Sequence, residues 1–379
     1  MPNNRLILAG IIGRYPVGGV TWCALHYIAG FQKLGYEIFY LEDTGECGFD
    51  PVANGITTDP SYAIRYIRQQ MTIVGLENSW AYIDYTGQYH GKTSRQVEEI
   101  CKEADLMINL SGGCWFNKSE YNSLPKIFID TDPGFTQQSI ADTGTGWYRD
   151  FFSAQDMLFT FALNVNSPTC RLAHTDFEWH PTIQPLALEF WPVLPPLQQA
   201  AYTTILSWKI DSFPGIDKGK GNDILRMIDL PNKSRQRILL AIAGQPPLDL
   251  LKKHGWELTD AVSNTIDPFT YRSFIQSSKA ELGFAKAMYS ETHSGWFSDR
   301  TQCYLATGRP ALVRSTGFCD LLPCGEGLLV FEDEEGILAG MEEIESDYAR
   351  HSRRAREIAE EYFADKKVVR NLLEIAGFQ

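Results

Sequence analysis

The chain has 379 residues, 44% of them hydrophobic, and a formal net charge of −13. A chain of this length has more residues than one average hydrophobic core accommodates, so the length predicts two domains. The negative charge makes nucleic acid an unlikely partner and disfavours anionic membrane surfaces, because nonspecific binding to both depends on positive charge. No apolar stretch reaches the roughly 20 residues that span a bilayer, and the first apolar run lacks the features of a signal peptide. We therefore expect a cytoplasmic globular protein.

The N-terminal half opens with a strand, a glycine turn and a helix. Arg5–Ile12 is a continuous apolar run, as expected of a buried parallel strand. Helical spacing from 20 to 34 and a second strand at 37–41 complete one βαβ unit. The turn lacks G-x-G-x-x-G, which argues against an NAD-type fold. Gly18 and Gly19 either let backbone approach a phosphate or an acceptor, or form a plain turn.

Further predicted strands at 105–110, 125–130 and 157–163 end in small or acidic residues. Ligands of open α/β sheets bind at the carboxyl ends of the strands. Asp130 and Asp132 are therefore candidates for a catalytic base, although Asp132 precedes Pro-Gly and alternatively nucleates a turn. His90 is a third candidate.

A segment rich in proline and aromatic residues, 184–199, predicts a domain linker. Beyond it, the alternation of strands and helices repeats, with strands at 202–208, 237–243 and 256–259. The pattern from 334 to the C-terminus is strongly helical. The pattern predicts an α/β fold with two domains.

The stretch from 280 to 313 is the most informative. An apolar strand is followed by a turn at Ser294–Gly295 and by a helix that starts near Ser298 and stops at Gly308, before a strand at 311–313. The backbone N–H groups of Gly295 to Asp299 and the helix dipole then converge on one point. This arrangement predicts an anion site, with pyrophosphate as the usual occupant.

This stretch also resembles a known signature. His293-Ser-Gly-Trp-Phe-Ser298 is similar to the His-Cys-Gly-Trp-Asn-Ser core of the nucleotide-sugar signature in GT-B glycosyltransferases. Gly308-Arg-Pro-Ala-Leu-Val313 and Gly325-Glu-Gly-Leu-Leu-Val-Phe331 resemble two strand motifs of retaining members of that fold. The resemblance spans residues 200–375 and is only architectural before them.

The resemblance implies two Rossmann-like α/β/α domains facing across a cleft, with a C-terminal helix that crosses back to the N-domain. The implied parts are an acceptor domain (1–190), a nucleotide-sugar donor domain (200–350) and the crossover helix (351–379). The implied activity is that of a hexosyltransferase, which moves a sugar from a nucleoside diphosphate donor, such as a UDP sugar, to an acceptor. Neither a metal nor any cofactor besides this co-substrate is implied.

Stabilising the charge of the leaving diphosphate is the main catalytic demand of such a transfer. The residues expected at the diphosphate are Gly18, Gly19, Lys286, His293, Ser294, Gly295, Ser298, Asp299 and Arg300. Candidates for the nucleoside are Ser207, Lys209, Gln245, Asp260 and Val262, and candidates for the sugar are Gly317, Phe318 and Asp320.

The chain departs from the family at the helix glutamate that holds the donor. That position falls on Thr301 when counted from His293, and on Cys303 when counted from Gly308. Neither is acidic, so either Asp299 takes this role or the donor is held differently.

The eight cysteines include no C-x-x-C and no metal-ligand spacing. We predict reduced thiols and no metal site.

Two alternatives remain open. A nucleotide-sugar 2-epimerase shares the fold and needs no separate acceptor, and a non-catalytic nucleotide- or partner-binding protein would tolerate the missing glutamate. The acceptor, the oligomeric state and the choice between inversion and retention stay undetermined. The aromatic residues of the N-terminal half either stack on a planar or sugar-like acceptor or form core: Trp22, Tyr82, Tyr85, Tyr89, Trp115, Phe116 and Trp147.

Overall fold

The computed structural model describes residues 4–115, 118–143, 146–195, 199–208 and 220–378. The chain forms two compact units. Unit 1 comprises Met1–Phe161, Leu172–Ala187 and Asp365–Gln379, and unit 2 comprises Ala162–Arg171 and Leu188–Ala364. Within the described residues, no helix has the length and apolar character of a membrane span.

Unit 1 is built on an eight-stranded sheet with the order β10-β9-β8-β7-β1-β2-β5-β6. All neighbouring strands are parallel except β5 and β6. The strands are β1 (Arg5–Ala9), β2 (Glu37–Glu42), β5 (Trp80–Ile83), β6 (Tyr89–Gly91), β7 (Leu106–Leu110), β8 (Lys126–Asp130), β9 (Met157–Thr160) and β10 (Trp179–Pro181).

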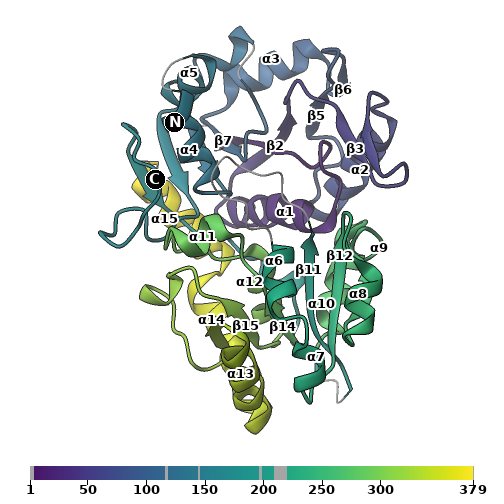
Figure 1. The fold of residues 1–379 in the computed structure, drawn as a ribbon. Coiled ribbons are helices and arrows are strands. Elements are labelled where there is room, and N and C mark those ends of the chain that lie inside the picture. Colours follow the sequence, from purple (N-terminus) through teal and green to yellow (C-terminus); the bar gives the residue numbers. More distant parts are fainter. Residues whose placement is uncertain (1–3, 116–117, 144–145, 196–198, 209–219, 379) are drawn as a thin grey trace. The chain divides into compact units, whose positions relative to one another are not determined.

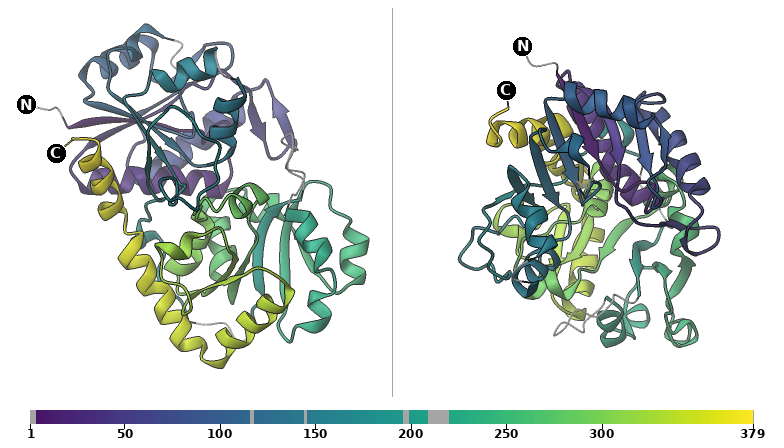
Figure 2. Two further views of the ribbon diagram at one scale, coloured as in Figure 1. Left: turned by 60° about the vertical axis from the view of Figure 1, so that its left-hand side comes forward. Right: turned by 90° about the horizontal axis from the view of Figure 1, so that it is seen from above.

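Helices cover both faces of this sheet (Figure 2). The sequence explains why: Ile7 belongs to one hydrophobic cluster, and Leu6 and Leu8, which alternation directs to the other face, are also fully buried. The helices of unit 1 are α1 (Gly18–Lys33), α2 (Ser61–Met71), α3 (Ser94–Glu103), α4 (Phe135–Thr143), α5 (Trp147–Ser153) and α15 (Asp365–Ile375). A small antiparallel hairpin, β3 (Gly48–Asp50) and β4 (Gly55–Thr57), follows β2.

Unit 2 contains a six-stranded, fully parallel sheet with the order β13-β12-β11-β14-β15-β16. The strands are β11 (Tyr202–Ser207), β12 (Ile238–Ala243), β13 (Glu257–Asp260), β14 (Ala280–Gly283), β15 (Ala311–Arg314) and β16 (Leu328–Phe331). The helices are α6 (Lys220–Arg226), α7 (Leu230–Lys233), α8 (Leu248–Lys253), α9 (Ala261–Thr265), α10 (Pro268–Gln276), α11 (Ala287–Glu291), α12 (Asp299–Ala306), α13 (Glu334–Ser346) and α14 (Tyr348–Tyr362) (Figure 1).

The predicted fold class is confirmed, since each unit is an α/β layer structure around a parallel sheet. The chain's last helix, α15, belongs to unit 1 and lies beside α1. Lys33 and Asp365 form an ion pair of 2.5 Å there, and a Cβ at Gly30 would contact Val369 at 3.1 Å. The return of the C-terminal segment to the N-terminal unit is therefore as expected.

Candidate functional site

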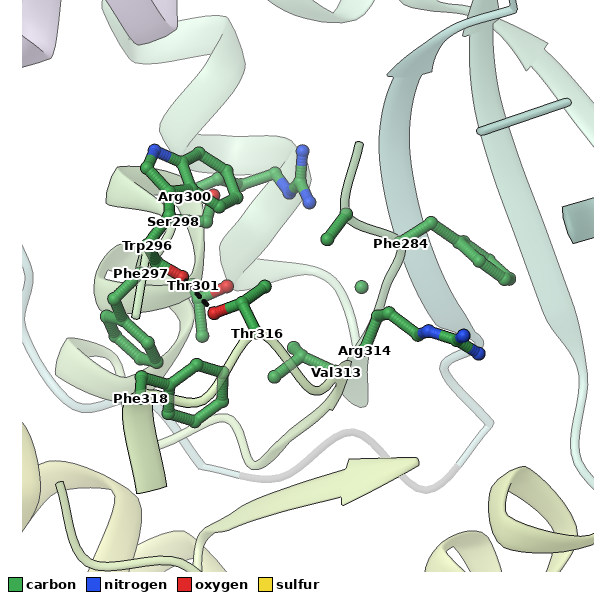
Figure 3. Close-up of a pocket in the computed structure, with 12 residues that line it drawn as sticks. Phe284, Trp296, Phe297, Ser298, Arg300, Thr301, Val313, Arg314, Thr316 and Phe318 are labelled. Carbon is green, nitrogen blue, oxygen red and sulfur yellow. Dashed lines mark hydrogen bonds between the residues drawn. The ribbon is translucent and has the colours of Figure 1, made fainter. Parts of the chain in front are cut away.

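A hollow lies in unit 2 where the carboxyl ends of β14 and β15 meet the start of α12. We call it the α12 hollow. It encloses about 250 Å³, part of it open to solvent. Only a small part of this space is enclosed by protein, so the hollow marks a position at the sheet edge rather than a preformed pocket for a whole ligand. Figure 3 shows Ser298 and Arg300 on one side of the hollow and Arg314 on the other.

The helix bounds at this hollow follow the sequence. α12 begins at Asp299, with Ser298 as the N-cap, and Gly308 ends it with a φ of 73°. The Ser298 side chain makes no capping bond to the helix backbone. The first-turn N–H groups and the positive end of the helix dipole lie at this end of α12, as an anion site requires.

Two backbone N–H groups just before α12 are already used within the protein. Gly295 N donates to Thr316 O at 2.8 Å, and Trp296 N donates to Ser294 Oγ at 3.2 Å. The expectation that the Gly295 N–H faces an anion is therefore wrong. Gly295 serves the packing instead, because its φ is 73° and a Cβ would lie 2.8 Å from Asn164 N. Ser294 is fully buried and donates to Tyr289 O, which gives it a structural role.

Arg300 lines the α12 hollow but is also tied into the sheet. Its Nε donates to Glu281 Oε1 at 2.7 Å, and its Nη1 donates to Ile205 O at 2.7 Å. Burial alone would lower the pKa of Arg300, but the Glu281 carboxylate outweighs burial and raises it. Arg300 therefore stays charged, with part of its donor capacity spent on this ion pair.

Arg314 is a lining residue that the sequence reasoning missed. It ends β15, and its guanidinium donates to the Glu332 carbonyl. An arginine has five N–H donors, and this bond uses one of them. The available signal was a basic residue directly at the carboxyl end of a predicted strand, the edge at which ligands bind.

The two helix positions at which the resemblance expects a glutamate differ in their distance from the hollow. Thr301 lines the α12 hollow, whereas Cys303 is buried and does not. Asp299 does not line it either, and partial burial raises the pKa of its carboxyl.

His293 lies in a separate cluster with Asn164, Gly317 and Asp320, none of which lines the α12 hollow. Its Nε2 is 3.2 Å from Asp320 Oδ2, and Asn164 Nδ2 donates to Gly317 O at 2.9 Å. A Cβ at Gly317 would come within 2.6 Å of the His293 ring. Of the three predicted sugar contacts, only Phe318 lines the hollow. The role of Asn164 depends on a contact across 129 residues or more, so no local pattern could have found it.

Other predicted donor contacts are not among the residues that line the α12 hollow. Lys286 precedes α11, a helix that the sequence reasoning did not predict, and its Nζ lies 5.4 Å from the centre of the Tyr289 ring. Gly18 and Gly19 form the first turn of α1 in unit 1, because that helix starts two residues earlier than predicted.

The predicted nucleoside contacts that the structure describes lie around the carboxyl ends of β11, β12 and β13, and none of these lines the hollow. Ser207 ends β11, Gln245 follows β12, and Asp260 caps α9, which contains Val262, by accepting from Ser263 N at 2.7 Å. Lys209 lies outside the described residues.

In unit 1, Asp130 is an unsuitable base. Its carboxylate accepts four hydrogen bonds, from Asp132 N, Thr136 Oγ1, Gln137 Nε2 and Thr160 Oγ1, at 2.8–3.2 Å. These donors use all four of its lone-pair positions. Burial raises its pKa, and only 2% of the residue is exposed. Asp130 therefore anchors the strand end, and the catalytic prediction for it is not supported. Asp132 is partly exposed, and its catalytic role stays a prediction.

His90 has the partner that a general base needs. His90 Nε2 lies 2.8 Å from Asp84 Oδ2, while Asp84 Oδ1 accepts from Thr86 N and Gln88 N. Partial burial would raise the pKa of Asp84, but the bonds from His90 and Thr86 outweigh it and lower that pKa. The carboxylate can thus fix the tautomer and orientation of His90.

Glu42 is a buried carboxyl at the carboxyl end of β2 that the sequence reasoning passed over. It accepts from Gly13 N at 2.7 Å, Arg14 N at 2.6 Å and Tyr40 OH at 2.8 Å. Burial raises the pKa of Glu42 to about 7 against these bonds. It holds the glycine turn that follows β1.

The prediction of eight reduced cysteines is wrong for one pair. Cys319 and Cys324 form a disulfide, with their Cα atoms 5.7 Å apart, directly after the hollow-lining Phe318. Their spacing of five residues matches no familiar motif, and the loop geometry alone brings them into bonding range. Within the described residues, no group of three or more His, Cys, Asp or Glu side chains is placed to hold a metal.

Comparisons with known proteins support the fold. No family model matches the chain, and no curated protein matches it. Among solved structures, an alpha-glucosyltransferase in complex with UDP and a 13-mer DNA containing an HMU base is similar with a TM-score of 0.62 and 11% identity, covering 98% of each chain. Sucrose-phosphate synthase from Thermosynechococcus elongatus is similar with a TM-score of 0.56 and 9% identity, also covering 98% of each chain. The chain therefore has the GT-B fold over nearly its whole length.

Proposed function

We propose that this protein is a glycosyltransferase that moves a sugar from a nucleoside diphosphate sugar to an acceptor hydroxyl. The observation that carries the proposal is the α12 hollow. It combines a helix N-terminus, the guanidinium of Arg314 and the carboxyl ends of two parallel strands. Each of these features favours a bound diphosphate.

In the proposed reaction, the bond between the anomeric carbon and the diphosphate oxygen breaks, and its electron pair stays with the diphosphate. The dipole of α12 and the charge of Arg314 stabilise this developing charge, so the reaction needs no metal in our proposal. The acceptor oxygen forms the new bond to the anomeric carbon, and its hydroxyl proton passes to a base. His90, held by Asp84, is the described residue best suited to accept it.

We propose a uridine donor and a small acceptor. Solved structures with this fold contain UDP or UDP-glucose, and several of the alpha-glucosyltransferase structures also contain DNA. A net charge of −13 disfavours a DNA acceptor here, because the phosphate backbone attracts positive proteins.

Calorimetry with UDP, GDP and ADP tests the donor site. We expect one nucleotide to bind, Arg314→Gln to weaken its binding about tenfold, and Ser298→Trp to abolish it by filling the hollow. The exposed Arg353 in α14 offers a matched control, and Arg353→Gln should bind like the wild type. If no nucleotide binds, the proposal fails. If a nucleotide binds but the sugar of its sugar nucleotide is neither transferred nor hydrolysed, a non-catalytic binding protein becomes the better conclusion. If the sugar nucleotide is instead converted to its epimer without an acceptor, the protein is an epimerase.

A further inference from the structure

The loop that follows β15 carries a disulfide directly beside the α12 hollow. Residues Phe318–Asp320 form a short 3-10 helix in this loop, and its middle residue, Cys319, is bonded to Cys324. The other six cysteines of the chain are free thiols. The oxidised pair is therefore specific to this loop, at the sheet edge where we propose that the donor binds.

The residue before Cys319 forms part of the hollow. Phe318 is 2% exposed and lines the hollow together with Phe297. The centres of the two rings lie 4.9 Å apart, at an interplanar angle of 72°. Figure 3 shows both rings on the same side of the hollow. A movement of the 3-10 helix would therefore displace this wall of the hollow.

The residue after Cys319 holds His293. Asp320 Oδ2 lies 3.2 Å from His293 Nε2 and accepts from Asn164 Nδ2 at 3.4 Å. His293 has a φ of 53°, in the left-handed region that is uncommon for residues other than glycine. Such a backbone conformation depends on the contacts around it, and Asp320 supplies one of them. Cys319 therefore lies between a wall of the hollow and the anchor of His293.

The backbone hydrogen bonds given by residues 320–322 are local to the loop. Their N–H groups donate to the carbonyls of Gly317 and Phe318, at 2.9–3.2 Å. The Leu322 side chain is buried and gives the loop a further anchor. The disulfide is the covalent bond that joins the start of the loop to its end. Breaking it should therefore loosen the 3-10 helix without unfolding unit 2.

The disulfide is accessible to a thiol reductant, because Cys324 is exposed and Cys319 is partly exposed. A thiolate of a dithiol reductant attacks Cys324 Sγ and forms a mixed disulfide, while Cys319 leaves as a thiolate and takes up a proton. The second thiol of the reductant then closes the reductant's own disulfide and releases Cys324. Two electrons and two protons pass from the dithiol to the protein.

We propose that the Cys319–Cys324 disulfide is a redox switch of the donor site. The oxidised form holds Phe318 and Asp320 in the positions that favour nucleotide binding, and reduction by a dithiol loosens both residues and weakens that binding. The physical reason is that a loop already fixed in its bound conformation loses less freedom when the ligand binds. Only the effect on the nucleotide rests on the proposed function; the loosening of the loop rests on the disulfide and its neighbours.

Two measurements on the full chain test the switch, each made with and without dithiothreitol. Calorimetry gives the affinity for UDP, and hydrogen-exchange mass spectrometry follows the amides of residues 318–322. We expect reduction to weaken UDP binding about three- to tenfold and to speed the exchange of these amides. Cys319→Ser/Cys324→Ser should bind UDP and exchange like the reduced wild type, whether or not the reductant is present. Reoxidation of the wild type should restore the original affinity.

A matched control separates this disulfide from the other cysteines. Cys47 is a partly exposed free thiol in unit 1, and Cys47→Ser should respond to dithiothreitol like the wild type. The inference is overturned if reduction leaves the exchange of residues 318–322 unchanged, or if the reduced protein binds UDP as tightly as the oxidised protein or more tightly. If neither form binds a nucleotide but the exchange responds to reduction, the redox-sensitive loop stands and the donor-site proposal falls.

Discussion

Replacing Arg300 should lower the free energy of unfolding of unit 2, whether or not a ligand is bound. The Glu281 side chain is fully buried, and its Oε1 receives the Arg300 Nε at 2.7 Å. Its Oε2 has no hydrogen-bond partner among the described residues. In Arg300→Met, this carboxylate loses its partner charge while remaining buried.

The structure sets the size of the expected loss. Removing one partner of a buried ion pair costs about 3–5 kcal/mol, because an uncompensated charge stays in a low-dielectric interior. For a domain of this size, each kcal/mol shifts the melting temperature by about 2–4 °C, so Arg300→Met should melt roughly 6–20 °C lower. Exposed ion pairs contribute about 0–1 kcal/mol, so the result distinguishes a buried structural pair from an exposed one.

Urea unfolding followed by circular dichroism, with calorimetry of the same samples, measures this loss. The double variant Glu281→Gln/Arg300→Met removes both charges and should recover at least about 2 kcal/mol relative to Arg300→Met. Our reasoning is refuted if Arg300→Met unfolds within about 1 kcal/mol of the wild type, or if the double variant recovers nothing. Because Arg300 has this structural role, Arg314→Gln is a more specific test of the donor site than a change of Arg300.

Two more predictions concern stability. The pKa of Glu42 is about 7 in the folded chain and 4.5 in the unfolded chain. Between these pH values the folded state therefore binds more protons than the unfolded state. The free energy of unfolding should fall by up to about 3 kcal/mol as the pH rises from 4.5 to 7. Glu42→Gln, measured by urea unfolding across that range, should flatten this slope; an unchanged slope would contradict the assignment. The Cys319–Cys324 disulfide closes a short loop, so Cys319→Ser/Cys324→Ser should lower the free energy of unfolding by about 2 kcal/mol. Dithiothreitol should lower that of the wild type equally and leave the double variant unchanged, and a wild type insensitive to the reductant would argue against the disulfide.

The helices and strands around the α12 hollow were predictable because their sequence signals are local. Helix α12 could be placed from its polar N-cap and from Gly308, and strand β14 from a short apolar run. The glycine after the helix adopts a positive φ, which the sequence position alone suggests.

The side chains that complete the sites were not predictable, because their partners are distant in sequence. Asp130 looks like an available base until Thr160 and Gln137 are seen to occupy its oxygens. Arg300 looks like a phosphate ligand until Glu281 is found beside it. The sequence contains these residues, but only the parallel sheet brings their strand ends together.

The charges at the two sheet edges divide the chemistry between the units. In unit 2, Arg314 lines the α12 hollow beside the N-terminus of α12, so we propose that this edge favours an anionic ligand despite the net charge of −13. In unit 1, Glu42 ends β2 and Asp84 follows β5, and Asp84 holds the His90 ring that we propose as the base. A transferase needs this separation, because the group that stabilises a leaving diphosphate must be positive, whereas the group that removes a hydroxyl proton must not be. Reversing the charge at the α12 hollow with Arg314→Glu should therefore weaken nucleotide binding and leave the His90–Asp84 pair unchanged.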